Sequence, residues 1–295
     1  MNSKPKNSRP HTIEHAVSIS NHLKKDSSHL KTSLKDGIKI SFSSKLYQNE
    51  KYNPYMEDIE LTLPNFINNK SQHLFGIFDG HGGDSSAKMT KEFFPKFLQK
   101  TLKDNPINIE HCMELSFKKI EEKAKELNYL LVGNTATIIL INTINHSIHC
   151  ANVGDSSCMI VNKEHAFKIS YDDKCSDENE KKRIEKEGGF IIDNRLNNVL
   201  AISRSIGDFD QKGKGLIAIP HIHKHNIHKK DKFLVVASDG IWDVVNQEIL
   251  FDISKEILVN SSVLNKSEAL VNKLVDFAVE NGSQDNISCV VVYFE

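Results

Sequence analysis

The chain alternates between short apolar runs and longer stretches in which apolar residues recur every three or four positions. The short runs are rich in Val, Ile and Phe and are bounded by polar turn residues, a pattern typical of β-strands. They predict seven strands, at residues 38–43, 73–78, 136–141, 147–153, 157–161, 233–237 and 287–294.

The longer stretches predict helices that each bury one apolar stripe. The three stripes are formed by Met89, Phe93, Phe94, Phe97 and Leu98, by Met113, Phe117, Ile120, Ala124 and Leu127, and by Leu270, Leu274, Phe277 and Ala278. Pro95 is a candidate kink in the first helix, and Asp177 caps a shorter predicted helix that ends at Gly188. The strands are too numerous and too often adjacent for simple strand–helix alternation, so we expect antiparallel sheets covered by helices.

Residues 1–36 lack this patterning. They are rich in Ser, Lys, His and Asn, and their basic residues outnumber their acidic ones. A segment with so few large apolar residues has little to contribute to a core. We therefore expect a mobile basic tail at residues 1–36 and one folded domain at residues 37–295.

Composition and charge exclude several classes of protein. Of the 295 residues, 39% are hydrophobic, and Lys plus Arg (38) nearly balance Asp plus Glu (39). That balance argues against a nucleic-acid partner, and no apolar run approaches the roughly 18 residues of a membrane helix. The five cysteines are scattered and form no CxxC pair, so we expect buried, reduced thiols. These features predict a soluble monomer of the cytoplasm, the nucleus or both.

Acidic residues stand at the ends of the predicted strands. Asp79, Asp155 and Asp239 follow three of them, Asp285 precedes a fourth, and Glu57 and Asp58 lie in an earlier YMED segment. Carboxylates that converge on one point repel one another unless a multivalent cation is present, and oxygen ligands select Mg²⁺ or Mn²⁺ over zinc. Two such ions can hold and activate a water molecule between them. The residues therefore predict a dinuclear hydrolase site.

Seven motifs make a more specific case, and they occur in the order YMED, FGIFDGHGG, GNTATI, ANVGDS, LAISRSIGD, LVVASDGIWDV and GSQDNIS. This series resembles the metal-dependent protein phosphatase family, the type 2C serine/threonine phosphatases, over residues 37–295. The resemblance implies an α+β fold: a central β-sandwich of two antiparallel sheets flanked on both sides by helices. It also implies two Mg²⁺ or Mn²⁺ ions per subunit.

The resemblance assigns roles to individual residues. The metal ligands would be Asp79, which bridges both ions, the Gly80 carbonyl, Asp239, Asp285, Glu57 and Asp58, with Asp155 and Asp243 at a weaker third metal and His81 as general acid. The implied activity is hydrolysis of phosphoserine and phosphothreonine in proteins by a metal-bridging water, without a phospho-enzyme intermediate. Phosphorylated proteins would be its partners.

Two positions depart from the family pattern. Asn53 stands where the family usually has an arginine that grips the substrate phosphate, and Lys51 is a nearby cation that could replace it. The family's usual GDSR turn reads GDSS here, with Ser157 in place of the arginine. These departures leave open a phosphoprotein-binding module with weak or no activity. A dinuclear nuclease or small-molecule phosphoesterase is a further alternative.

Three other features have structural explanations. The alternating histidines His221, His223 and His225 fit either a metal cluster or, as we expect, the wet face of a strand. The GNTAT segment lacks the lysine of a P-loop and is predicted to be a tight turn. Trp242 is expected to pack against the core.

Overall fold

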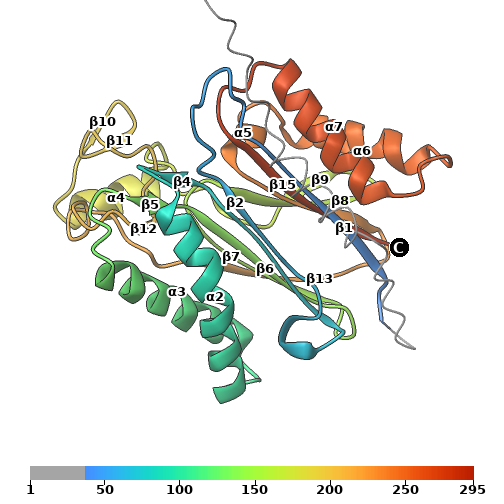
Figure 1. The fold of residues 1–295 in the computed structure, drawn as a ribbon, viewed down its shortest axis with the longest axis horizontal. Helices are drawn as coiled ribbons and strands as arrows, with labels where there is room; N and C mark the ends of the chain where they lie inside the picture. Colours follow the sequence, from blue (N-terminus) through green and yellow to red (C-terminus); the bar gives the residue numbers. More distant parts are fainter. Residues whose placement is uncertain (1–36) are drawn as a thin grey trace, which may run out of the picture. The chain divides into compact units, whose positions relative to one another are not determined.

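Two five-stranded antiparallel sheets lie at the centre of the fold, in the computed structural model that describes residues 37–295 (Figure 1). One sheet has the order β1-β15-β14-β8-β9, with the strands Ile40–Tyr47, Ile287–Phe294, Asp231–Ala237, Ser157–Asn162 and Ala166–Lys168. The other has the order β13-β7-β6-β3-β2, with the strands His221–Asn226, Ser147–Val153, Ala136–Asn142, Gln72–Phe78 and Ile59–Leu63. The predicted tail, residues 1–36, lies outside the described residues.

Helices cover the outer face of each sheet, so the layers run helix, sheet, sheet, helix (Figure 1). Helices α2 (Ser85–Asp104) and α3 (Ile109–Glu126) pack together over β2, β3 and β7. Helices α6 (Gln247–Val259) and α7 (Lys266–Glu280) pack over β1, β8, β9 and β15. The predicted α+β sandwich is confirmed.

Smaller elements connect these layers. They are the 3₁₀ helix η1 (Phe66–Asn68), helices α4 (Glu178–Lys186) and α5 (Asp239–Trp242), the hairpin of β10 (Ile191–Ile192) and β11 (Arg195–Leu196), and a three-stranded sheet of β12 (Ile206–Gly207), β5 (Gly133–Asn134) and β4 (Gly80–His81). The GNTAT segment was expected to be a tight turn, and that expectation is wrong. Gly133 and Asn134 form the middle strand of the small sheet, because they pair with β4 on one side and β12 on the other.

Three apolar clusters hold the layers together. The cluster between the two sheets includes Phe75 and Ile139 from one sheet and Ile160 and Val290 from the other. The outer clusters join each helix pair to its sheet, through Phe94 and Phe117 on one side and Leu250, Leu270 and Leu274 on the other. All five cysteines are buried and free, as expected.

The predicted strands and helices agree with the structure apart from their ends. Helix α2 continues through Pro95, and Asp177 accepts hydrogen bonds from two backbone N–H groups at the start of α4. Trp242 packs against the core and donates from Nε1 to the carbonyl oxygen of Ala237 at 2.8 Å. Strand β2 and helix α6 were not predicted.

The antiparallel register places the acidic motifs at one end of both sheets. The end of β3, which leads into Asp79, pairs with the start of β2, just after Asp58. The end of β7, which leads to Asp155, pairs with the start of β6 beside β3. In the other sheet the end of β14, which leads to Asp239, pairs near the start of β15, just after Asp285. Neighbouring antiparallel strands alternate in direction, so these positions share an edge.

Candidate active site

Five aspartates converge at this end of the sandwich. Burial raises the pKa of Asp79 well above its ordinary value, and the charges of Asp58, Asp239, Asp155 and Asp285 raise it further. Like charges that face one another disfavour ionisation. The charges of these residues, which come from both sheets, therefore act on one another.

Two of these carboxylates have buried oxygens without a partner. Burial raises the pKa of Asp58 to about 6, although hydrogen bonds from Ser238 and Ser288 lower it, and burial together with the charges of neighbouring aspartates raises the pKa of Asp239 to about 8. Asp58 Oδ2 and Asp239 Oδ1 have no hydrogen-bond partner. An unpaired buried acceptor is costly unless something else binds it. The donor set is oxygen-only and highly charged, which fits Mg²⁺ or Mn²⁺.

Asp155 and Asp243, the residues implied for a third metal, lie close to a lysine. Burial raises the pKa of Asp155 to about 6, and the nearby ammonium group of Lys174 opposes that rise. Lys174 Nζ also lies 3.9 Å from Asp243 Oδ1. This ammonium group therefore offsets part of the negative charge at that side of the centre.

Polar residues hold the loop that carries Asp285 against the YMED segment. Asn286 accepts a hydrogen bond from the backbone N–H of Glu57 at 2.7 Å and donates to the carbonyl oxygen of Tyr55 at 3.0 Å. A Cβ on Gly240 would lie 2.0 Å from the carbonyl oxygen of Asn286, so only glycine allows this close approach. Asp239 and Asp285 are thus carried by two backbone segments in direct contact.

Asp79 is held by the GNTAT segment. The backbone N–H of Asp79 donates to Thr135 Oγ1 at 3.2 Å, and the N–H of Thr135 donates to the Asp79 carbonyl oxygen at 2.8 Å. Asn134, next to Thr135, is fully buried and accepts hydrogen bonds from Ser86 and Thr90 of α2. Helix α2 and the strand-end loop of Asp79 are therefore fixed to each other.

A second group of potential metal ligands lies outside the predicted set. Among residues 37–295, only Asp173, Glu180 and His221 bring three donor atoms within 4.8 Å of one another. Arg204 already neutralises this group, because its guanidinium lies 3.1 Å from Asp173 and 2.7 Å from Glu180. Arg183 adds a further bond to Glu180 at 2.7 Å. The group is an ion-pair network rather than a metal site.

No three of the five converging aspartates satisfy that same distance. Water molecules would therefore have to complete the coordination of any ion held there, as Mg²⁺ commonly allows. Asp285 and Asp243 are exposed, and Asp79 and Asp239 keep part of their surface accessible. The centre is therefore open to solvent and to a substrate.

His81 lies one residue beyond Gly80, in β4, and pairs with a buried carboxylate. Its Nε2 lies 2.8 Å from Asp208 Oδ2. The side chain of Asp208 is 4% exposed and that of His81 is 30% exposed. Asp208 ends the LAISRSIGD motif, and no role for it was predicted from the sequence.

The two phosphate-binding candidates are engaged elsewhere. Asn53 donates from Nδ2 to the carbonyl oxygen of Gln284 at 2.8 Å. Lys51 Nζ lies 2.8 Å from the hydroxyl of Tyr52 and sits over the ring of that residue. Ser157, in the GDSS turn, hydrogen-bonds to Asp172. None of the three presents a free cation to the acidic centre.

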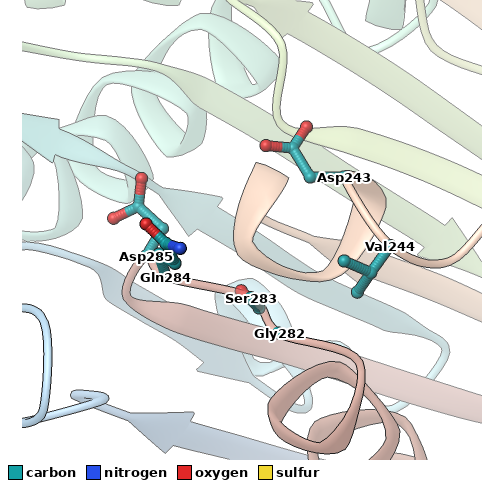
Figure 2. A pocket seen from close by; sticks show the side chains of 6 residues that line it. All are labelled: Asp243, Val244, Gly282, Ser283, Gln284 and Asp285. Carbon is teal, nitrogen blue, oxygen red and sulfur yellow. The ribbon is translucent and has the colours of Figure 1, made fainter.

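A pocket of about 320 Å³ opens beside the acidic centre. Asp243 and Val244 at the end of α5 form one side, and the loop from Gly282 to Asp285 forms the other (Figure 2). In Figure 2 the Asp243 and Asp285 carboxylates lie on separate sides of this space. The loop that Asn53 contacts therefore also lines the pocket.

The histidines at positions 221, 223, 225 and 228 lie on edge strand β13 or just after it. His223 is exposed, as the wet-face interpretation expected. His221 Nε2 lies 2.9 Å from Asp173 and His225 Nε2 lies 2.8 Å from Asp231. Each of these two histidines thus has its own carboxylate partner.

The chain is similar to known proteins over most of its length. A family model described as protein phosphatase 2C matches residues 18–287. Protein phosphatase 2C homolog 1 of Saccharomyces cerevisiae is 30% identical over 267 residues, which cover 83% of this chain and 90% of the yeast protein. Protein phosphatase 2C homolog 2 of Schizosaccharomyces pombe is 32% identical and covers 81% of this chain and 69% of its own.

Two solved structures share the fold. A Caenorhabditis elegans sex determining protein superposes with a TM-score of 0.77 at 24% identity, covering 95% of this chain and 70% of its own. A serine-threonine phosphatase 2C from Toxoplasma gondii superposes with a TM-score of 0.72 at 19% identity, covering 90% of this chain and 97% of its own.

Proposed function

The chain belongs to the protein phosphatase 2C family and is a metal-dependent serine/threonine protein phosphatase, and from that premise we propose which residues perform its reaction. Two Mg²⁺ or Mn²⁺ ions bind at the acidic centre. Asp79 and the Gly80 carbonyl hold them from one sheet, Asp239 and Asp285 hold them from the other, and Glu57 and Asp58 contribute directly or through water. Asp155 and Asp243 provide a weaker third site.

The mutual repulsion of the five aspartates is the observation that carries this assignment. Burial and like charge raise the pKa values of Asp58, Asp79 and Asp239 together, although Asp58 and Asp239 each keep a buried oxygen without a partner. A structure that gathers negative charge in this way is stable at neutral pH when cations neutralise it. When bound, the cations supply an activated water nucleophile and offset the charge on the phosphoryl group.

His81 is proposed to protonate the leaving group. The oxygen of a phosphorylated serine or threonine leaves as an alkoxide, which is a poor leaving group, so a proton delivered as the P–O bond breaks lowers the barrier. The proton moves from the imidazole to the serine or threonine oxygen, and water supplies the oxygen that forms the new P–O bond. No side chain is phosphorylated in this scheme.

Substrate capture is proposed to be weak. Asn53 offers a neutral amide that already binds the Gln284 carbonyl, and Lys51 has to leave Tyr52 before it can act as a point charge on phosphate. The metal-binding carboxylates are all present, so the consequence is a high KM rather than an inactive binding module. The substrates are phosphorylated proteins.

The metal assignment is tested with Asp79→Asn. The amide would remove one negative charge from the proposed metal-binding centre, so Mn²⁺-dependent hydrolysis of a phosphothreonine peptide should fall by about a thousandfold or more while the protein stays folded. Asp276→Asn, an exposed change on α7, is the matched control and should leave turnover intact. Near-normal Mn²⁺-dependent turnover of Asp79→Asn would show that the ions bind elsewhere.

A further inference from the structure

We propose that Asp208 is the positioning residue of His81, which it holds by the ring so that the other ring nitrogen presents the proton to the leaving group. The proposal rests on the proposed role of His81 as general acid. His81 Nε2 and Asp208 Oδ2 lie 2.8 Å apart, although the two residues are separated by 127 positions in the chain. With Nε2 bonded to a carboxylate, Nδ1 is the nitrogen that remains for the substrate.

The small sheet brings this pair together. His81 in β4 pairs with Gly133 in β5, and Gly133 pairs on its other side with Gly207, the residue before Asp208. A Cβ on Gly133 would lie 2.0 Å from Asp208 Oδ2 and 2.6 Å from His81 Nε2. The middle strand therefore needs a glycine at this position, because any side chain there would collide with the His81–Asp208 pair.

Asp208 is itself fixed from several sides. Ser205 Oγ donates to the same Oδ2 at 2.6 Å, and the backbone N–H of Asp208 donates to the carbonyl oxygen of Val132. Asp208 has a φ of 51°, in the left-handed region that Asp and Asn tolerate better than most residues. A buried carboxylate held this firmly restricts where the imidazole can lie.

Helix α3 also contacts the segment that carries Asp208. Glu121 accepts from the backbone N–H of Gly207 at 3.0 Å and pairs with Lys212 Nζ at 2.9 Å. Lys212 also donates to the carbonyl oxygen of Ser205 at 2.8 Å. The loop that carries Asp208 is therefore attached to a core helix, as a positioning residue requires.

The test uses Asp208→Asn, because asparagine keeps the size of the side chain and the left-handed backbone. An amide can donate to Nε2 instead of accepting from it, which lets the ring adopt the other tautomer. On a phosphothreonine peptide kcat should fall by about tenfold to a hundredfold, part of the roughly 10²–10⁴ that a general acid contributes, with little change in KM. On p-nitrophenyl phosphate, whose leaving group needs no proton, kcat should change by less than about twofold.

Two comparisons separate this proposal from the function on which it rests. His81→Gln should show the same dependence on leaving group, and adding Asp208→Asn to it should cause no further loss. If His81→Gln lowers kcat equally on both substrates, the general acid assignment is wrong and Asp208 has no proton donor to position. If the loss of kcat in His81→Gln depends on the leaving group and the loss in Asp208→Asn does not, only the role of Asp208 is overturned.

The chain contains a matched control for the loss of a buried His–Asp pair. His225 Nε2 and Asp231 Oδ2 also lie 2.8 Å apart, and Asp231 begins β14, the strand whose other end leads to Asp239. Asp231→Asn should cost stability without altering the leaving-group dependence. If it alters that dependence as Asp208→Asn does, the effect is structural and the proposal fails.

Gly133→Ala provides a second test that keeps every charge in place. Its methyl group displaces Asp208 and His81 from each other, so it should reproduce the selective loss on the phosphothreonine peptide even if Asp208→Asn folds poorly. Circular dichroism and a thermal melt establish that the variant is folded. A folded Gly133→Ala enzyme with equal losses on both substrates would contradict the proposal.

Discussion

At the scale of single residues, the acidic centre is held in place mainly by neutral donors. Serine hydroxyls bind Asp58, the backbone of Asp79 bonds to Thr135, and Asp285 accepts from the N–H of Asn286. Lys174 is the cation that lowers the pKa of Asp155. Neutral donors fix the orientation of the carboxylates and leave their charge for multivalent ions.

The departure at Asn53 leads to a prediction about substrate affinity. An arginine there would add charge-assisted hydrogen bonds to a phosphate dianion, each worth about 1.5–3 kcal/mol. Asn53→Arg should therefore lower KM for a phosphothreonine peptide by about tenfold or more, measured by initial rates at saturating Mn²⁺.

The control is Asn53→Gln, which keeps a neutral amide and should not lower KM. Lys51→Ala should raise KM in the native protein and have little effect in the Asn53→Arg background, if Lys51 is the substitute cation. An unchanged or higher KM for Asn53→Arg would mean that phosphate is bound by other groups.

A buried histidine in β3 predicts a pH dependence of stability. Burial lowers the pKa of His73 to about 4, below the roughly 6.5 of an unfolded chain. The unfolded state therefore binds more protons between these values, and stability is lost as pH falls from about 6.5 toward 4. At pH 5 the loss from this residue is about 2 kcal/mol relative to pH 8.

His73→Leu should remove this contribution. Urea unfolding at pH 5 and pH 8 measures the free energy of unfolding, and the difference between the two pH values should be about 2 kcal/mol smaller in the variant than in the native protein. His111→Leu, an exposed change on α3, should not alter that difference. An unaltered difference in His73→Leu would mean that His73 is not a source of acid sensitivity.

At the scale of elements, long periodic segments were readable from the sequence and short pairings were not. The stripe from Met113 to Ala124 predicts α3 because one helix face is buried over about three turns. Strand β2 and helix α6 carried usable signals, the alternation IELTL and the spacing of Leu250, Ile253 and Ile257, and were missed. The two-residue strands β4, β5 and β12 have no local signal, since their pairing depends on residues far apart in the chain.

The same limit applies to the site. The carboxylates were predicted as candidates because each stands at a strand end, next to a glycine or in a short motif that can be recognised locally. Asp208 and Arg204 were missed, although both lie in the quoted LAISRSIGD segment, because their partners lie elsewhere in the chain: His81 for the first, Asp173 and Glu180 for the second. Sequence reveals the residue types, and only the fold shows which ones meet.

Arg204 carries the element-scale prediction. It joins Asp173, Glu180 of α4 and the carbonyl oxygen of Ile219 before β13. Burial alone would raise the pKa of Glu180, but hydrogen bonds from Arg204 and other donors outweigh it and lower the pKa to about 2. Arg204→Met leaves two buried carboxylates without their main cation, so it should destabilise the protein by about 3–5 kcal/mol in denaturant unfolding.

An exposed ion pair supplies the comparison for Arg204. Lys230 and Glu164 lie 2.6 Å apart with both side chains about 60% exposed, and Lys230→Met should leave the free energy of unfolding almost unchanged, because solvent screens an exposed pair. If Arg204→Met is as mild as Lys230→Met, the network does not hold these elements together. Asp173 also accepts from the N–H of Gly154, next to Asp155, so the network extends to the acidic centre.

At the scale of the whole molecule, the acidic centre takes its carboxylates from both sheets. Asp58, Asp79 and Asp155 lie at the ends of strands in one sheet, and Asp239 and Asp285 lie at the ends of strands in the other. Under the proposed metal assignment, cations bound there would link the two sheets, and their removal would leave the two sets of charges to repel each other. Metal content should therefore affect the stability of the whole domain.

No helix within residues 37–295 is long and apolar enough to cross a membrane.

This coupling to metal content predicts that the pH dependence of stability differs between the metal-free and the metal-bound protein. The folded pKa values of Asp79 and Asp239, the latter about 8, lie above those of an unfolded aspartate, so the metal-free folded state retains protons that the unfolded state has released. That stability is complete below pH 4 and is lost as pH rises through the folded pKa, at about 1.4 kcal/mol per pH unit for each retained proton. Between pH 7 and 9, where His73 is mostly neutral in both states, the Tm in EDTA should fall as these protons are released. Saturating Mn²⁺ should raise the Tm and make it fall less with rising pH. In EDTA, the Asp79→Asn variant should have a higher Tm than the native protein. A metal-free Tm that is constant or rises over this range would show that the carboxylates are not mutually repelling.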